Sequence, residues 1–262
     1  MIWMDDRFCR QLPQPWRSVD DAFRVRGKIY REPAGANRRT LRFELAGEGY
    51  FLKLHWGVGW KEILKNLLSL RLPVLGAANE WRAIHRLHEL GVETMNLAAY
   101  GQAGRNPAAL RSFVVTQELV NTVSLEDYCA DWLEHPPPFA VRQKLIRRVA
   151  EMTRKLHQCG VNHRDLYICH FLLQQPWDGA DEGLHLYLID LHRVQIRHRT
   201  PWRWRVKDVG ALYFSALDAG LSRRDLLRFI RVYSHQPLRQ ALAEERGFWQ
   251  AVARRARALY DE

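Results

Sequence analysis

The chain has 262 residues, which is enough for one large domain or two small ones with a sizeable core. Forty Lys and Arg against 29 Asp and Glu give a net charge of +11, which predicts an acidic partner such as nucleic acid, an anionic membrane surface, a polyanionic substrate or an acidic protein. There is no signal-peptide pattern, no apolar run long enough to span a bilayer and no C-x-x-C pair among the four cysteines, so we expect a cytoplasmic protein whose membrane contact is at most peripheral.

The first half of the chain is predicted to be rich in strands. Three segments of alternating polarity are separated by Gly-containing turns, which predicts a meander. An amphipathic helix, a second helix and two short strands follow. The predicted strands are 23–32, 40–46, 50–55, 96–101 and 112–119, and the predicted helices are 60–70 and 79–90.

After residue 120 the pattern becomes helical. Ser124 is a good N-cap, and a long helix with a clear stop signal ends at Gly160. The sequence therefore predicts a two-lobe plan, joined near residue 119. The predicted helices of this half are 124–133, 139–160, 207–220, 222–234 and 247–260, with short strands at 171–173 and 184–190.

Charged residues follow an order that is typical of protein-kinase-like phosphotransferases. Lys53 lies in the third predicted strand, Glu80 in a later helix, Asp165 after the long helix, and Asp190 at the end of an apolar strand. In such enzymes the Lys neutralises nucleotide phosphates, the Glu fixes the Lys, the first Asp orients the acceptor hydroxyl and the second Asp holds Mg²⁺. Because placement and charge account for most of this catalysis, the joint order predicts phosphoryl transfer.

Each of these residues taken alone is also compatible with a purely structural role. A strand Lys is usually a surface residue, and a helix Glu is usually solvated. Glu62, in the amphipathic segment, competes with Glu80 for the pairing with the Lys. The turn before the second strand has one glycine where a Gly-rich loop is expected, so Arg38 and Arg39 are predicted to cover phosphates or meet the substrate, with a solvated turn as the alternative.

The segment around Asp165 has one unusual position. Loops that open with His-Arg-Asp carry an Asn five residues after the Asp to hold a metal, and here that position is His170. Structural zinc is the alternative chemistry, although the cluster lacks the paired spacing of zinc ligands. The His and Cys residues of this cluster are His157, Cys159, His163, Cys169 and His170.

A basic stretch follows the second Asp. Residues 192–207 contain five Arg, one Lys and no acidic residue, so we expect this stretch at the mouth of the site, with Arg193, Arg203 and Arg205 binding acidic groups of the substrate. The alternatives are a solvated loop or a nucleic-acid face, because two Trp residues interleave the Arg residues. No recognisable nucleic-acid module is present, so no nucleic-acid partner is predicted.

Together these motifs resemble the lipopolysaccharide core heptose kinases, the WaaP/RfaP family, which are distant kinase-fold enzymes. The resemblance rests on GVNHRDLYICHFLL, LIDLHRVQ, GWKEILKNLL with LPVLGAANEW, and KDVGALYFSALDAG, and it extends nearly from end to end. A His at position 170 is a trait of this group. The resemblance implies an α+β, two-lobed protein-kinase-like fold with a small β-rich N-lobe (1–119) and a larger helical C-lobe (120–262).

The family phosphorylates O4 of the first heptose of the inner core, using ATP and Mg²⁺. Carried over by motif, Asp165 is the catalytic residue and Asp190 binds the metal. His170 either binds the metal as well, holds Asp190, or orders the loop, since His is a poor Mg²⁺ ligand. The implied cofactor-binding residues are Lys53, Glu80 and the backbone of Gln117 to Leu119.

The implied acceptor is the lipopolysaccharide inner core, a polyanionic glycolipid whose carboxylates and lipid A phosphates suit the basic chain. The amphipathic segment 56–75 is expected either to pack on the N-lobe or to dock on the anionic inner membrane or on an acidic partner such as acyl carrier protein. Two alternatives remain: a kinase acting on another core sugar such as Kdo, and a non-catalytic kinase-fold binding module. The joint presence of Lys53, Asp165 and Asp190 argues against the second.

Overall fold

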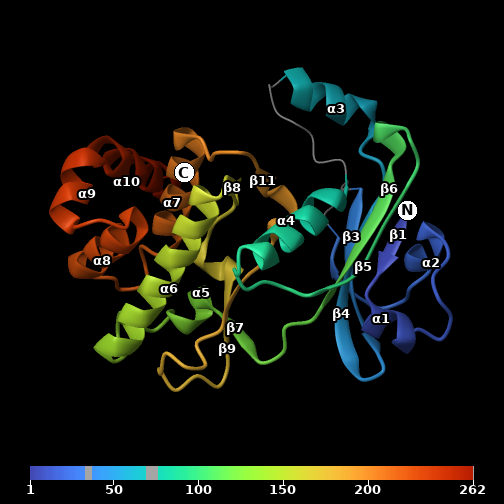
Figure 1. Ribbon diagram of the computed structural model, residues 1–262, viewed down its shortest axis with the longest axis horizontal. Helices are drawn as coiled ribbons and strands as arrows, with labels where there is room; N and C mark the ends of the chain where they lie inside the picture. The colour runs from blue at the N-terminus through green and yellow to red at the C-terminus, as the bar shows by residue number, and fades with distance from the viewer. Residues whose placement is uncertain (33–36, 69–75, 262) are drawn as a thin grey trace. The chain divides into compact units, whose positions relative to one another are not determined.

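The computed structural model describes residues 1–32, 37–68 and 76–261, which form two compact units (Figure 1). The N-terminal unit comprises Met1–His85 and Met95–Leu119, and the C-terminal unit comprises Arg86–Thr94 and Val120–Glu262. Segment Arg86–Thr94, which a division at residue 119 assigns to the N-lobe, therefore groups with the C-terminal unit.

The N-terminal unit is built on a six-stranded antiparallel sheet in the order β1-β5-β6-β4-β3-β2. Side chains alternate across it: Leu52 and Phe113 lie in a core that also contains Phe8 of α1, whereas Val114 packs on the other face with Tyr100. The central strand β4 therefore has a neighbour on each side, which fixes its residues firmly. The strands are β1 (Ile2–Met4), β2 (Lys28–Arg31), β3 (Arg38–Leu45), β4 (Glu48–His55), β5 (Leu97–Ala103) and β6 (Arg111–Gln117), and the helices are α1 (Asp6–Gln11), α2 (Val19–Phe23), α3 (Gly59–Leu68) and α4 (Ala78–Glu89).

The C-terminal unit is mainly helical. Helices α7 and α10 pack closely at Gly210, where a Cβ would lie 2.8 Å from Cγ of Arg255, and Val209 and Val252 contribute to the core between helices. None of the described helices combines the length and apolar character needed to cross a bilayer. The helices are α5 (Leu125–Tyr128), α6 (Phe139–Gln158), α7 (Trp202–Ser215), α8 (Arg223–Ser234), α9 (Leu238–Glu244) and α10 (Arg246–Tyr260), and the strands are β7 (Thr122–Ser124), β8 (Val161–Asn162), β9 (Phe171–Gln174), β10 (Leu186–Leu188) and β11 (Gln195–Ile196).

Two small antiparallel ladders position the functional segments of the C-terminal unit. Strand β10 pairs with β9 in the register Leu188↔Phe171, so the residues after β10 lie beside those before β9. Strand β11 pairs with β8 in the register Gln195↔Asn162, so the basic segment lies beside the start of the loop that carries Asp165. Pairing at these two short ladders is what brings residues 160–170 and 189–197 together.

The predicted change from a strand-rich first half to a helical second half is confirmed, but several boundaries were wrong. Phe23 ends helix α2 and not a strand, because Ser18 and Asp21 form a capping box that starts a helix there. Helix α5 is only four residues long, and α7 begins at Trp202, directly after Pro201, which favours helix starts. No sequence pattern indicated β1, α1 or α9.

Candidate active site

Lys53 and Glu80 form an ion pair inside the N-terminal unit. Lys53 on β4 places its Nζ 2.5 Å from Oε1 of Glu80 on α4, as the sequence order suggested. The Glu80 side chain is only 1% exposed while that of Lys53 is 24% exposed, so the carboxylate holds an ammonium group that still reaches solvent. The side chain of the competing Glu62 lies outside the described part of the structure.

The backbone at the end of β6 is the segment predicted to contact adenine. The N–H of Gln117 donates to the carbonyl of Asn96, and that of Glu118 donates to the carbonyl of Gly49, each at 2.9 Å. The Glu118 carboxylate is bound by Arg42 at 2.8 and 2.9 Å. The N–H groups of Gln117 and Glu118 are therefore already bonded within the N-terminal unit.

The predicted phosphate-covering arginines lie at the start of β3. Arg39 donates twice to Oε1 of Glu32, at 2.9 and 2.6 Å, and its guanidinium lies 5.6 Å from the Trp56 ring. Arg38 is the first residue of β3, opposite His55. The turn that precedes them, residues 33–36, lies outside the described residues. Arg39 is thus engaged within its own unit.

In the C-terminal unit, only one of the two carboxylate oxygens of Asp165 has a hydrogen-bond partner in the described structure. Its Oδ1 accepts a hydrogen bond of 2.6 Å from Nη1 of Arg193, whereas its Oδ2 is buried without a hydrogen-bond partner in the described structure. Buried polar atoms rarely lack a partner in folded proteins, and a catalytic role is one of the explanations for those that do. An unsatisfied carboxylate oxygen held by a neighbouring Arg is suited to accept a proton from a hydroxyl group.

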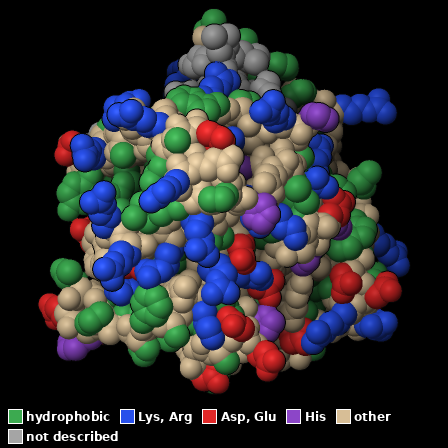
Figure 2. Space-filling model, turned by 60° about the vertical axis from the view of Figure 1, so that its left-hand side comes forward, with side chains coloured by type: hydrophobic (Ala, Val, Ile, Leu, Met, Phe, Trp, Pro, Cys, Tyr) green, Lys and Arg blue, Asp and Glu red, His purple; other side chains and the backbone are tan. Residues whose placement is uncertain are grey.

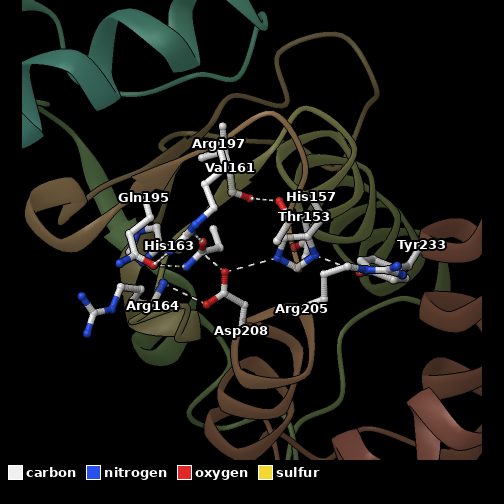
Figure 3. Close-up of polar contacts among 12 residues, drawn as sticks. Thr153, His157, Val161, His163, Arg164, Gln195, Arg197, Arg205, Asp208 and Tyr233 are labelled. Carbon is white, nitrogen blue, oxygen red and sulfur yellow. Dashed lines mark hydrogen bonds and ion pairs between the residues drawn. The ribbon is translucent and has the colours of Figure 1, made fainter. Parts of the chain in front are cut away.

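The loop that carries Asp165 is anchored from beneath by Asp208 of α7 (Figure 3). Oδ2 of Asp208 accepts from the backbone N–H of His163 at 2.6 Å, and Oδ1 accepts from that of Arg164 at 2.8 Å. Arg164 adopts the left-handed region at φ +78°, which is uncommon for a non-glycine residue. Burial lowers the pKa of His163, whose Nε2–H donates to the carbonyl of Ile189 at 3.0 Å.

The anchor extends into the helical core. His157 of α6 places Nε2 3.2 Å from Oδ2 of Asp208 and Nδ1 2.8 Å from the hydroxyl of Tyr233 on α8, and that hydroxyl accepts from Nε of Arg205 at 3.0 Å (Figure 3). A neutral imidazole satisfies every group when Arg205 donates to Tyr233, Tyr233 to His157, and His157 to Asp208. Burial raises the pKa of Tyr233 to about 12, so its hydroxyl keeps the proton that it donates. The loop that carries Asp165 is thereby tied to three helices.

Asp190 and His170 meet because of the β9–β10 register. The N–H of Ile189 donates to the carbonyl of His170 at 2.9 Å, and Asp190 turns away in the left-handed region at φ +61°. Its Oδ1 lies 2.6 Å from Nδ1 of His192 and its Oδ2 lies 3.5 Å from Nε2 of His170. Nδ1 of His170 lies 2.7 Å from the backbone carbonyl of Asp165, which can only accept, so Nδ1 carries a proton and Nε2 faces the Asp190 carboxylate.

This arrangement suits a magnesium ion better than zinc. Within the described ranges, no group of three or more His, Cys, Asp or Glu side chains is placed to hold a metal. Magnesium is commonly bound through one or two carboxylates together with substrate phosphates and water, so a single carboxylate such as Asp190 fits it. His170 lies beside this carboxylate, with its Nε2 3.5 Å from Oδ2 of Asp190. Of the side chains considered for zinc, that of His157 bonds to Asp208 and Tyr233, and Nε2 of His163 bonds to the carbonyl of Ile189.

The predicted substrate-binding arginines of 192–207 lie in different surroundings. Arg193 binds Asp165, and Arg203 lies with its guanidinium carbon 5.4 Å from the Trp204 ring. Arg205 turns inward, 4.8 Å from the Phe248 ring and bonded to a Tyr hydroxyl of α8. The face drawn in Figure 2 nonetheless carries many Lys and Arg side chains, as the net charge of +11 leads one to expect.

The helical unit also contains a cavity of about 270 Å³ with an almost wholly apolar lining. Its walls come from α5, α6, α7, α8 and α10. Nothing in the sequence pattern pointed to it, because its lining residues are the ordinary apolar faces of these helices. Representative lining residues are Leu125, Trp132, Leu145, Val149, Leu212 and Phe229.

Fold and residues together define a kinase-type phosphotransferase. The sequence matches the model of the "Lipopolysaccharide kinase (Kdo/WaaP) family" over residues 20–233, and the chain belongs to that family. It is therefore a phosphotransferase with an alcohol acceptor and, as a kinase, uses ATP.

Named relatives and a solved structure cover most of the chain. It is 53% identical over 235 residues to the lipopolysaccharide core heptose(I) kinase WaaP of Escherichia coli, covering 88% of each chain, and 54% identical over 237 residues to that of Pseudomonas aeruginosa, covering 90% of this chain and 88% of the relative. The structure of a WaaP in complex with acyl carrier protein is similar with a TM-score of 0.84 at 45% identity, covering 99% of both chains. The two-lobed kinase-like fold that the sequence predicted is thereby confirmed.

Sequence reasoning missed the anchor residues. Asp208 falls within a predicted helix, and the sequence signal for it is a charged residue that opens the otherwise apolar run DVGAL, an unusual buried charge. His157 was considered only as a metal ligand. Tyr233 lies 76 residues from His157, so no local pattern connects the two.

Proposed function

We propose that this chain is an ATP-dependent kinase that phosphorylates O4 of heptose I in the lipopolysaccharide inner core. The observation that carries the proposal is the identity of 53–54%, over 88–90% of the chain, to two proteins named lipopolysaccharide core heptose(I) kinase. The buried, unpartnered Oδ2 of Asp165 supports it, because an alcohol acceptor needs such a base.

In the proposed reaction the heptose hydroxyl oxygen attacks the γ-phosphorus of ATP, and the bond from that phosphorus to the β–γ bridging oxygen breaks. ADP leaves, and the hydroxyl proton passes to Oδ2 of Asp165. Arg193, which binds Oδ1, holds the carboxylate in one orientation. The loop anchor at Asp208 keeps the backbone around Asp165 fixed, which matters because in-line transfer depends on placement.

The proposed nucleotide contacts lie on the N-terminal unit. Lys53, fixed by Glu80, is the residue proposed to neutralise phosphate charge, and the backbone of Gln117 to Leu119 is proposed to contact adenine. Arg38 and Arg39 are secondary candidates for phosphate or substrate contact, and the Glu32 pairing of Arg39 makes it the weaker of the two.

For the metal, we assign Asp190 as the proposed Mg²⁺ ligand and His170 as its neighbour on the metal side. When bound, Mg²⁺ supplies positive charge that neutralises the phosphates during transfer. Asp190 sits in the left-handed region at the end of β10, a conformation often kept at functional sites. The Nδ1–H of His170 holds the Asp165 carbonyl, so His170 connects the two acidic residues of the site.

Acyl carrier protein is the partner that we propose for this chain. The solved relative at 45% identity is in complex with acyl carrier protein, and a chain of net charge +11 attracts an acidic protein. The apolar cavity of the helical unit has the chemistry to take an acyl chain. We expect acyl-loaded carrier protein to bind more tightly than the unloaded form and to raise the melting temperature. Equal affinity for both forms would remove the cavity from this proposal.

Membrane contact is proposed as peripheral only. Trp60, Leu64 and Leu68 of α3 are exposed on a helix that also carries Lys61 and Lys65, a pattern suited to an anionic surface or an acidic partner. The remainder of the amphipathic segment, residues 69–75, lies outside the described residues.

The decisive experiment is to incubate the protein with ATP and truncated lipopolysaccharides and locate the new phosphate by mass spectrometry and ³¹P NMR. Phosphate on O4 of heptose I in an acceptor that ends at heptose supports the proposal. Phosphate on an acceptor that ends at Kdo would favour the alternative sugar. ATP binding without any transfer would favour a non-catalytic binding module.

A further inference from the structure

Four cationic side chains of the C-terminal unit surround one indole. The guanidinium carbons of Arg164, Arg197 and Arg203 lie 5.3, 5.7 and 5.4 Å from the centroid of the Trp204 ring, and Nζ of Lys207 lies 4.8 Å from it. We call these five side chains the Trp204 cluster. Each cation is within the range of cation–π attraction, but four like charges around a single ring still repel one another.

Two cations of the cluster lack an acidic partner. Within residues 1–32, 37–68 and 76–261, neither Arg197 nor Arg203 forms an ion pair. Arg197 donates instead to two neutral amide oxygens, Oδ1 of Asn162 at 2.5 Å and Oε1 of Gln195 at 2.6 Å. Burial, and after it the charge of Arg203, lowers the pKa of Arg197, which agrees with positive charge held close together and not neutralised.

The indole itself points to a missing acceptor. Nε1 of Trp204 is buried and has no hydrogen-bond partner in the described structure. An indole N–H can only donate, and a buried donor without an acceptor is unfavourable. An anionic oxygen at this position would satisfy the donor and offset the repulsion between the cations at the same time.

Arg205 shows how an Arg with a structural role is held in this chain, and Arg203 of the cluster is not held in that way. It is on the same helix turn as Arg203, yet its guanidinium lies on the Phe248 ring and its Nε is bonded to the Tyr233 hydroxyl. A structural Arg of this chain is thus seated among core aromatic rings with a defined hydrogen bond. Arg203 is exposed and has no such partner among the described residues.

The cluster is built on the catalytic loop. Arg164 immediately precedes Asp165, and the backbone N–H of Arg197 donates to the carbonyl of Gly160 at 2.9 Å. The Arg197 side chain also binds Asn162, at the strand that opens the loop. The cations of the cluster are distinct from Arg193, which is engaged with Asp165.

Resting on the proposed function, we propose that the Trp204 cluster is an anion subsite that takes a phosphate or carboxylate group of the acceptor glycolipid, at a position other than the reacting hydroxyl. Guanidinium groups present paired donors that match both anions, and an ammonium adds charge without fixed geometry. Free inorganic phosphate shares this chemistry, so the experiment separates the two sources.

The kinetic arm compares two double variants with the same change in net charge. Arg203→Gln with Lys207→Gln removes two exposed cations of the cluster, and Arg223→Gln with Arg224→Gln removes two exposed cations at the start of α8 as the control. We expect the cluster variant to raise the KM for heptose-terminated lipopolysaccharide at least tenfold with the KM for ATP within about twofold, and the control to change neither beyond twofold. Equal effects of the two double variants, or equal effects on both KM values, would overturn the proposal.

The binding arm needs no turnover. Titration calorimetry without ATP compares Kdo-bearing lipid A with the same glycolipid after removal of its phosphates and reduction of its carboxylates. We expect the wild type to bind the charged form at least tenfold more tightly and the cluster variant to lose that preference. A contrary result has three parts: inorganic phosphate binds the wild type, the wild type binds the charged and the uncharged glycolipid equally well, and the cluster variant binds the charged glycolipid as tightly as the wild type does. In that case the site is one for free ions and the assignment is wrong. Absence of phosphate transfer to heptose would refute the proposed function but leave this binding result intact.

Discussion

The two units hold their functional charges in different ways. In the N-terminal unit, Lys53 depends on one ion pair with Glu80, set by two elements close in sequence. In the C-terminal unit, Asp165 lies on a loop whose backbone is held by Asp208, which is held in turn by residues of α6 and α8. We infer that a substitution on the nucleotide side acts locally, whereas one beneath the catalytic loop acts at a distance.

The largest effect is expected at the loop itself. Asp165→Ala removes the proposed base and should lower kcat at least about 10³-fold, roughly 4 kcal/mol in barrier height. ATP affinity should change less than about threefold, because this carboxylate serves the acceptor. Steady-state kinetics and nucleotide titration measure both, with Glu182→Ala, an exposed acid of the same unit, as the control. A kcat within tenfold of the wild type would remove Asp165 from the chemistry.

The next effect tests action at a distance. Asp208→Asn replaces a carboxylate oxygen that accepts from a backbone N–H by an amide that cannot, so we expect kcat to fall about 10²-fold and stability by about 2–4 kcal/mol. Asp225 is equally buried, 1% exposed, and is bound by Ser222 and two Arg residues away from the loop. Asp225→Asn should therefore destabilise without a matching loss of kcat.

This matched pair separates a positioning role from a purely structural one. If the two variants lose kcat in proportion to their loss of melting temperature, Asp208 is only a fold residue and the anchor has no special importance for catalysis. A kcat loss specific to Asp208→Asn, measured below both melting transitions, supports the positioning role.

The same contrast explains what the sequence revealed. Lys53, Glu80, Asp165 and Asp190 are candidate site residues from the sequence alone because each sits on a predicted element in a familiar order, and the structure pairs Lys53 with Glu80 as expected. The fold class was predictable for a similar reason: alternation and helical spacing are local signals.

The rest depended on contacts between distant residues. Strand β1 is three residues long and gains its identity only by pairing with β5 about a hundred positions later, as Trp3 does with Tyr100. Arg203 and Arg205 look equivalent in sequence, and the start of α7 at Trp202 determines that one joins the Trp204 cluster while the other faces the helical core. Composition alone cannot separate two such arginines.

On the nucleotide side we expect a smaller and local effect. Lys53→Ala should lower kcat/KM for ATP about thirtyfold, roughly 2 kcal/mol, since bonds to charged groups contribute about 1.5–3 kcal/mol. Because the change leaves a Glu80 carboxylate that is 1% exposed without its partner, stability should also fall, by about 1–3 kcal/mol after allowance for the solvent access of Lys53.

A double variant separates the loss of nucleotide use from the loss of stability. Lys53→Ala with Glu80→Gln removes the stranded charge, so melting temperature should recover while kcat/KM for ATP stays low. Lys28→Ala, an exposed Lys of the same sheet, is the control and should change neither. Recovery of nucleotide use together with stability would mean that the pair serves the fold alone.

The smallest expected effect concerns His170, which touches both acidic residues of the catalytic unit. Its Nδ1–H holds the Asp165 carbonyl while its Nε2 faces Asp190 at 3.5 Å, so it has one bond to the loop and one side toward the proposed metal. On the metal-side account, His170→Asn restores the residue usual at this position in kinases and should keep at least about half of kcat. His170→Ala should lose about fivefold in kcat, roughly 1 kcal/mol, and need more Mg²⁺ for half-maximal rate.

On the loop-ordering account, the Asn and Ala variants have similarly low activity because neither side chain reproduces the imidazole bond, and both variants melt at a lower temperature than the wild type. A Mg²⁺ titration of wild type and both variants, read beside their melting curves and with the exposed His135→Ala as control, decides between them. Identical Mg²⁺ dependence in wild type and His170→Ala would make His170 part of the loop anchor and leave Asp190 as the sole proposed protein ligand of the metal.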